Sequence, residues 1–403
     1  MLAKLAGSPT AIVGVSLSHS INFVQLGSFY RARRVLVTGH TGFKGGWLTA
    51  WLQAMGAEVV GFSLPSAPGD APITTWAGVD GAALIDLEGD INDYESLLAV
   101  VQRHRPEIIL HLAAQSLVRR SYREPLWSFS TNVMGTAHVL EAARHVDSVR
   151  AVVAVTSDKC YENREWEWGY RETDPLGGHD PYSASKGCAE IVAHAYRRSF
   201  FGGEHAAAIA TARAGNVIGG GDWCEDRLVP DIFRGLVNGT PIVLRNPRSV
   251  RPWQHVLEPL GGYLHLARTL VERGAAVAEG WNFGPSPDDA LTVREVAERI
   301  VSLWGSGELV VREDPDAPHE AGLLTLDCSK ARMRLGWRPR LRCGDALART
   351  VEWYRAFAAD AEAVGQVTRS QIAWYDAVLD GRLDGVPDGG ARLSAPSPAL
   401  AAR

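Results

Sequence analysis

The sequence contains few cysteines, no metal-binding pattern and no long apolar run. Its five cysteines lie far apart, without CxxC or Cys/His spacing, and an odd number argues against a disulfide framework. We therefore expect no metal site and a reduced, cytoplasmic protein. No apolar run reaches the roughly 18 residues that cross a membrane. The net charge is -5, and no basic block indicates binding to nucleic acid.

Short β-branched runs alternate with helical stretches through the first half of the chain. This alternation predicts an α/β fold, a doubly wound parallel sheet of the Rossmann type, followed by a smaller, mostly C-terminal α+β substrate domain. The expected strands are residues 34–38, 58–62, 83–86, 107–111, 150–155 and 206–211. The expected helices are residues 43–55, 92–103, 124–145 and 181–200.

The 403 residues are enough for two domains and flanking segments. We interpret residues 1–30 as a loosely ordered extension rather than a secretory signal, because the apolar run is short and no cleavage pattern follows. The dinucleotide-binding domain is expected over 31–213 and about 258–284. The substrate domain is expected over about 214–257 and 285–383. Residues 384–403 are rich in Ala, Pro, Gly and Ser and are predicted to be disordered.

A glycine-rich loop follows the first expected strand, with Gly39, Gly42 and Gly45 in G-x-x-G-x-x-G spacing. Such glycines permit a tight turn, close approach of a pyrophosphate and close packing of the helix. Within this loop His40 and Lys44 could face either phosphate or solvent. The predicted cofactor-binding residues of the loop are Gly39, Thr41, Gly42, Phe43, Lys44 and Gly45.

The end of the second expected strand carries neither the acidic residue that usually holds a ribose 2′-hydroxyl nor an arginine for a 2′-phosphate. The residues therefore leave NAD and NADP open. Asp90 and Ile91 follow the third strand and could hold the adenine. Alternatively, Asp90 could belong to the N-terminal cap of the next helix, before Asn92.

Catalytic chemistry is concentrated in two short segments. Tyr182 and Lys186 lie four residues apart on an expected helix and so share one face. Lysine next to tyrosine, together with the positive nicotinamide ring, favours the phenolate. Ser157 at the end of the fifth strand could hydrogen-bond the hydroxyl that Tyr182 deprotonates. Asp158 and Lys159 are not needed for a simple oxidation. From residue types alone they could equally be an exposed ion pair.

These residues resemble a known family. The chain is similar to extended short-chain dehydrogenases/reductases of the nucleotide-sugar 4,6-dehydratase group, and within it to the CDP-glucose branch. The similarity extends over about residues 28–380. In most 4,6-dehydratases Lys159 is replaced by Glu, whereas the CDP-glucose branch has Ser-Asp-Lys. The segments that carry the resemblance are 37–45 (VTGHTGFKG), 111–115 (HLAAQ), 131–135 (TNVMG), 156–163 (TSDKCYEN), 180–183 (DPYS), 214–222 (AGNVIGGGD) and 251–259 (RPWQHVLEP).

The resemblance implies NAD as cofactor and a nucleotide sugar as substrate. Tyr182 would take the proton of the glucose 4-hydroxyl, Lys159 would be the base at C5, and Asp158 would protonate the departing 6-hydroxyl. It also implies a homodimer formed by the helices near 124–145 and 181–200. Further implied cofactor contacts are Leu112, Ala113 and Ala114. The implied substrate contacts are Gln115, Ser116, Asn216, Arg227, Arg251 and His319.

Two alternative functions are considered. Another enzyme on this scaffold, such as a dTDP-glucose or GDP-mannose 4,6-dehydratase or a nucleotide-sugar 4-epimerase, would share the nucleotide loop. An epimerase would not need Asp158 and Lys159, and the other dehydratases would be expected to carry Glu in place of Lys159. A non-catalytic dinucleotide-binding regulator would be expected to lose Tyr182 or Lys186, and both are present.

Overall fold

A computed structural model describes residues 23–65, 73–203, 206–312 and 322–383. Most of the predicted N-terminal extension and the whole tail from residue 384 lie outside the described residues. Within the described ranges, no helix is both long and apolar enough to span a membrane.

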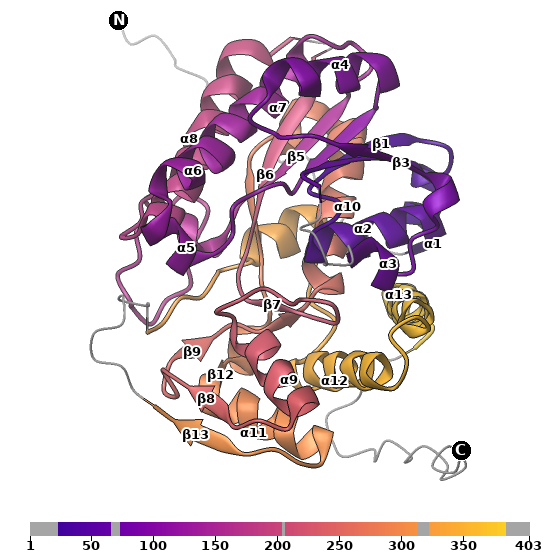
Figure 1. The fold of residues 1–403 in the computed structure, drawn as a ribbon. Coiled ribbons are helices and arrows are strands. Elements are labelled where there is room, and N and C mark those ends of the chain that lie inside the picture. The colour runs from indigo at the N-terminus through magenta and orange to yellow at the C-terminus, as the bar shows by residue number, and fades with distance from the viewer. Residues whose placement is uncertain (1–22, 66–72, 204–205, 313–321, 384–403) are drawn as a thin grey trace, which may run out of the picture.

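The centre of the fold is a seven-stranded sheet whose paired strands are all parallel, as predicted (Figure 1). Alternate residues of its first strand face different cores: Val35 and Val37 pack with one hydrophobic cluster and Leu36 with the other. Burial on both faces explains the continuous apolar runs in the sequence. In spatial order the strands are β11 (Gly280–Phe283), β6 (Ala208–Ala214), β5 (Ala151–Val155), β4 (Ile108–His111), β1 (Arg34–Thr38), β2 (Glu58–Ser63) and β3 (Leu84–Glu88).

Helices cover both faces of this sheet (Figure 1). One layer consists of α4 (Tyr94–His104), α7 (Gly135–Arg144) and α8 (Pro181–Phe200), which pack side by side. The other contains α1 (Phe23–Tyr30), α2 (Phe43–Ala54) and α10 (Leu257–Arg273). β11 pairs with β6, and α10 packs on β5 and β6. We therefore propose that residues 258–284 belong to the nucleotide-binding half, as the sequence predicts.

The smaller half lies beyond the carboxyl ends of the strands (Figure 1). Its elements are three two-stranded sheets and several helices. Among the described residues they are β7 (Val217–Ile218), α9 (Leu228–Asn238), β8 (Ile242–Leu244), β9 (Val250–Arg251), β10 (Gln254–His255), β12 (Leu291–Thr292), α11 (Val293–Trp304), β13 (Leu309–Val311) and α12 (Cys343–Ala359).

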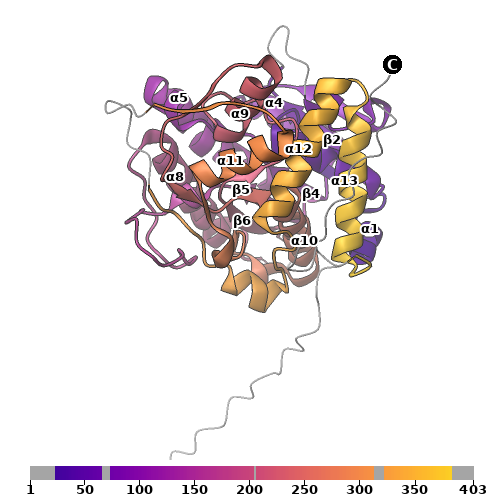
Figure 2. The ribbon, with the colours of Figure 1, turned by 90° about the horizontal axis from the view of Figure 1, so that it is seen from below.

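Three features differ from the sequence-based expectations. Phe23–Tyr30 form α1, in which Leu26 and Tyr30 are fully buried, rather than part of a loose extension. The helix expected over 124–145 is divided into α6 (Pro125–Phe129), a π-helical turn and α7. Helix α13 (Val364–Leu379), expected in the substrate half, packs on α12 but also lies beside α1 (Figure 2) and contacts α2 and α3 (Ile73–Trp76). A buried hydrogen bond from Trp51 to Asp376 fixes it there.

Candidate active site

A cavity of about 850 Å³ lies at the carboxyl ends of the parallel strands, where the two halves meet. This is the usual ligand position in doubly wound sheets. The cavity brings together almost all of the predicted site residues. They are Gly39, Thr41, Gly42, Phe43, Lys44, Gly45, Asp90, Ile91, Leu112, Ala113, Ala114, Ser116, Ser157, Asp158, Lys159, Tyr182, Lys186, Asn216, Arg227 and Arg251.

The glycine loop fits a dinucleotide. Gly39 has a positive φ of 75°, and a Cβ there would lie 2.7 Å from the backbone nitrogen of Ala113. A Cβ at Gly45 would lie 2.0 Å from the carbonyl oxygen of Gly39. No side chain caps α2, which begins after Gly42, so its first-turn amides are available to an anion. These features are those that a bound pyrophosphate requires.

His40 occupies neither of its two predicted environments. It is fully buried, with hydrogen bonds to the Ser63 hydroxyl at 2.9 Å and to Asp86 at 2.8 Å. Its ring covers Gly61, where an added Cβ would come within 2.4 Å of it. His40 therefore stabilises the ends of β2 and β3.

Asp90 accepts hydrogen bonds from Asn92 and also lines the cavity, so both of its predicted roles have structural support.

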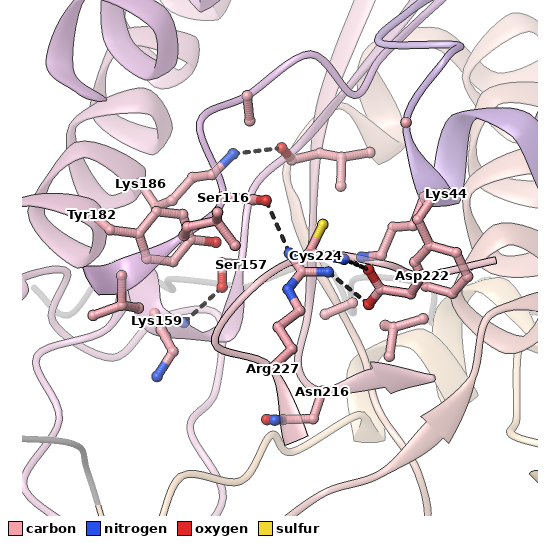
Figure 3. A pocket seen from close by; sticks show the side chains of 18 of the residues that line it. Lys44, Ser116, Ser157, Lys159, Tyr182, Lys186, Asn216, Asp222, Cys224 and Arg227 are labelled. Carbon is pink, nitrogen blue, oxygen red and sulfur yellow. Dashed lines mark hydrogen bonds and ion pairs between the residues drawn. The ribbon is translucent and has the colours of Figure 1, made fainter. Parts of the chain in front are cut away.

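Lys44 points into the cavity, toward Asp222 and Arg227 (Figure 3). Burial, together with the nearby cations Arg227 and Lys186, lowers the pKa of Lys44 to about 7. The pKa falls because three basic side chains converge on one buried space. A negatively charged ligand in this space would stabilise all three cations.

Ser157, Asp158 and Lys159 form a tight turn directly after β5. Ser157 caps the turn: its hydroxyl accepts a hydrogen bond from the Lys159 amide at 3.2 Å and donates one to Asp158 at 2.9 Å. Asp158 is buried, and this burial raises its pKa, although Lys159 and Ser157 oppose the rise. A Cβ at Gly215 would lie 2.7 Å from the Asp158 carboxylate, so only glycine leaves room for it. The turn thus presents a carboxyl group with an increased tendency to hold a proton.

Tyr182 and Lys186 lie on the first turns of α8, opposite the Ser157 turn (Figure 3). Asp180 caps the helix by accepting from the Ser183 amide at 2.9 Å, which fixes the start of the helix. Burial lowers the pKa of Lys186 to about 8, and its ammonium donates to the Val155 carbonyl at 3.3 Å. Burial raises the pKa of Tyr182 to about 12, with Ser157 opposing the rise. Burial of Tyr182 therefore opposes the phenolate, which the expected pair of cations, the lysine and the nicotinamide ring, would favour.

Arg227 crosses the cavity between the two halves (Figure 3). Its guanidinium pairs with Asp222 at 2.9 Å and donates to the Ser116 hydroxyl at 2.9 Å. Asp222, which sequence reasoning did not select, is almost fully buried and holds Arg227 in place. The glycine run immediately before Asp222 is the sequence signal that could have identified it. Arg251 is also buried, and donates to the carbonyls of Val250 and Gly322.

One predicted substrate contact, Gln115, does not line the described cavity. Gln115 is buried outside its wall: its amide donates to Leu117 and Ser128 and accepts from the Leu117 amide. Its hydrogen-bonding groups are engaged in shaping the loop after β4, so this prediction needs correction. His319 lies outside the described residues.

Comparison with known proteins agrees with this geometry. The family model described as GDP-mannose 4,6 dehydratase matches residues 36–350. The chain is 52% identical over 338 residues to a CDP-glucose 4,6-dehydratase of Salmonella typhimurium, covering 82% of this chain and 92% of the relative. It is 31% identical to a dTDP-glucose 4,6-dehydratase of Streptomyces niveus, covering 80% and 93%.

Solved structures show the same fold. A dTDP-glucose 4,6-dehydratase of Streptomyces venezuelae, solved with NAD bound, has a TM-score of 0.67 at 29% identity, covering 80% of this chain and 97% of that one. An epimerase of Methanothermobacter thermautotrophicus has a TM-score of 0.71 at 25% identity, covering 85% and 97%.

The glycine loop, the parallel sheet and the Ser–Tyr–Lys set define a nicotinamide-dependent enzyme of the short-chain dehydrogenase/reductase type. More specifically, the chain belongs to the GDP-mannose 4,6 dehydratase family.

Proposed function

We propose that this protein is an NAD-dependent CDP-glucose 4,6-dehydratase, which converts CDP-D-glucose to CDP-4-keto-6-deoxy-D-glucose and water. One observation carries the proposal: a carboxyl group and an amine, Asp158 and Lys159, stand in the cavity beside the Ser157, Tyr182 and Lys186 set. The 52% identity to a CDP-glucose 4,6-dehydratase supports the choice of substrate.

NAD would lie along the glycine loop, with its pyrophosphate on the uncapped amides of α2 and its adenine near Asp90 and Ile91. When bound, NAD supplies the acceptor for the hydride that leaves C4 of the sugar, the donor that returns it to C6, and a positive charge near Tyr182. That positive charge favours the phenolate, which the burial of Tyr182 disfavours.

The oxidation half of the reaction is assigned to α8 and the end of β5. Tyr182 removes the proton of the sugar 4-hydroxyl, and Ser157 hydrogen-bonds the same oxygen. Lys186, buried and one helical turn along, stabilises the tyrosinate by its charge.

The elimination half is assigned to the turn after β5. Once C4 is a ketone, the C5 proton is acidic, and Lys159 takes it. Asp158 gives its proton to the 6-hydroxyl, which leaves as water. Burial raises the pKa of Asp158, and this is the direction that a general acid requires.

The nucleotide diphosphate is assigned to the basic side of the cavity. Arg227 and Arg251 present guanidinium groups suited to phosphate oxygens, and Asn216 and Ser116 add neutral hydrogen-bonding groups. A bound diphosphate would compete with Asp222 for Arg227.

We also propose that the protein acts as a cytoplasmic homodimer. Apolar side chains are exposed on the helices that the family resemblance assigns to the dimer: Leu126 is 83% exposed on α6, Ile191 58% and Phe200 50% on α8. Burial of such a surface by a second copy would stabilise the dimer.

The test is incubation of the purified protein with NAD and, separately, CDP-, dTDP-, UDP- and GDP-sugars. A 4-keto product absorbs in alkali, and its formation from CDP-glucose is the expected result. Turnover of only a non-cytidine sugar would contradict the assignment of the base. Formation of a 4-epimer without loss of water would contradict the dehydratase assignment and support the epimerase alternative.

A further inference from the structure

A buried polar network lies behind the catalytic turn. Its centre is Glu190 on α8, one helical turn beyond Lys186 and only 4% exposed. The Glu190 carboxylate accepts hydrogen bonds from the Thr156 hydroxyl at 2.5 Å, the Thr211 hydroxyl at 2.6 Å and the Arg213 guanidinium at 2.8 Å. Although burial raises the pKa of Glu190, Arg213 and these hydroxyls together hold it below its usual range. The Glu190 carboxylate is therefore ionised and paired with Arg213 and the two hydroxyls.

Arg213 extends the network to Tyr161, the residue that follows the catalytic turn. Its second guanidinium nitrogen donates to the Tyr161 hydroxyl at 2.6 Å, and this hydroxyl donates to the Asn282 side chain at 2.8 Å. Asn282 lies on β11, and its amide donates to the Tyr170 carbonyl at 2.8 Å. The Tyr161 hydroxyl is thus engaged both as acceptor and as donor and is not available to a substrate.

These contacts fix both ends of the turn that carries the two elimination residues. Thr156, before the turn, is bound to Glu190, and Tyr161, after it, is bound to Arg213 and Asn282. A buried ion pair contributes little net stability compared with apolar packing. A fixed geometry is therefore the physical property that this arrangement most clearly supplies.

We propose that Tyr161 is a positioning residue for the elimination half of the reaction, holding Asp158 and Lys159 at the sugar through its hydroxyl. This inference rests on the function proposed above. Tyr182 and Lys186 do not depend on the hydroxyl in the same way, because α8 positions them directly. Ser157 shares the turn, so the oxidation is affected as well, but less than the elimination, because only one of its three groups lies there. A displacement of about 1 Å in a reacting group can slow a reaction roughly 100-fold. Here we expect it to slow the removal of the C5 proton and the departure of water.

The variant Tyr161→Phe removes this one hydroxyl, and Tyr170→Phe is a matched control. The two rings stack, with centroids 5.1 Å apart, and both are buried. The Tyr170 hydroxyl, however, donates to Asn163, in the loop after the catalytic turn, and not to a residue of the Glu190–Arg213–Tyr161 network. Each variant is mixed with NAD and CDP-glucose in a single turnover, and the absorbance of the reduced nicotinamide is followed together with the 4-keto-6-deoxy product.

In Tyr161→Phe we expect the reduced nicotinamide to form and then persist, because oxidation is slowed much less than product formation, which should be at least about 10-fold slower. Deuterium at C5 of the substrate should then slow product formation more than it does in the wild-type protein, because proton removal has become rate-limiting. Tyr170→Phe should behave like the wild type. NAD binding and the unfolding temperature, measured for both variants, separate a loss of positioning from a loss of folding.

Equal slowing of oxidation and elimination in Tyr161→Phe, or no change in either, overturns the inference. If Tyr161→Phe does not fold, Arg213→Lys replaces it in the test. Lysine keeps the charge beside Glu190 but cannot contact Glu190 and the Tyr161 hydroxyl together as the guanidinium does. Reduced nicotinamide should persist in this variant too, and if it does not, the inference is overturned. Failure of the wild-type protein to convert CDP-glucose refutes the proposed function, and the inference with it. The two failures are therefore distinguishable.

Discussion

Replacing Asp158 by asparagine removes one acidic proton from the cavity and changes little else in its shape. The Ser157 hydroxyl, which donates to Asp158 at 2.9 Å, can donate equally to an amide oxygen. The other atom of the side chain faces Gly215, where only glycine leaves room for it. We therefore expect Asp158→Asn to fold and to bind NAD as the wild type does, while losing the group proposed to protonate the departing hydroxyl.

The size of the effect follows from the chemistry of the step. Positioned general acids contribute roughly 100- to 10,000-fold to a rate, which corresponds to about 3–5 kcal/mol of activation free energy. Burial raises the pKa of Asp158, so that the wild-type carboxyl group is better prepared to donate than an exposed one. We expect product formation in Asp158→Asn to fall within that range and C4 oxidation to stay close to the wild-type rate.

A substrate with a better leaving group makes this test decisive. Fluoride at C6 departs without protonation, so a 6-deoxy-6-fluoro analogue of CDP-glucose does not need the acid. Asp158→Asn should convert this analogue at nearly the wild-type rate while remaining slow with CDP-glucose. If the variant is equally slow with both substrates, or as fast as the wild type with CDP-glucose, the general-acid assignment is wrong.

Four further predictions concern other parts of the molecule. Lys159→Ala should slow exchange of the C5 proton with solvent deuterium far more than C4 oxidation, measured by NMR. Burial raises the pKa of Glu258 to about 7, so the stability it contributes is full below its unfolded pKa of 4.5 and is lost as the pH rises through 7. Glu258→Gln should therefore reduce the loss of stability between pH 5 and pH 8 by up to about 3 kcal/mol in urea unfolding. Gly220→Ala should lower stability by about 1–3 kcal/mol, because its Cβ would lie 1.9 Å from the Trp353 ring. Leu126→Glu should weaken the dimer, measured by light scattering.

Each of these has a contrary outcome. Equal loss of exchange and oxidation in Lys159→Ala would remove lysine as the C5 base. An unchanged pH dependence in Glu258→Gln would mean that other groups, such as Asp376 with a pKa also raised by burial to about 7, dominate it. Wild-type stability of Gly220→Ala would show that the Trp353 ring moves freely. An unchanged mass for Leu126→Glu would place the dimer contact elsewhere.

Patterns local in the sequence were sufficient for the fold and for most of the cavity. The parallel strands are buried on both faces, which makes each a continuous apolar run, and the glycine loop must follow the first of them. The helix expected over 124–145 was less accurate, because its periodicity did not reveal the π-helical turn at Ser130–Met134, which packs against α8.

Other features depend on contacts between distant segments. Gln115 was predicted to touch substrate because of its place in a motif, yet its amide donates to Leu117 in its own loop and to Ser128 on α6. His40 was expected near phosphate or solvent, but it is buried against Ser63 and Asp86. Asp222 acquires its role only when the chain brings Arg227 and Ser116 together across the cavity.

The chemical groups of this protein can be identified from the order of its residues. They are the amides of the glycine loop and the hydroxyl, carboxyl, amine and phenol that the reaction needs, at spacings that local structure places on one turn and one helix face. The electrostatic state of those groups depends on the folded chain. Burial raises the pKa of Asp158 and Tyr182 and lowers that of Lys44 and Lys186, because each loses water when the two halves of the chain enclose the cavity.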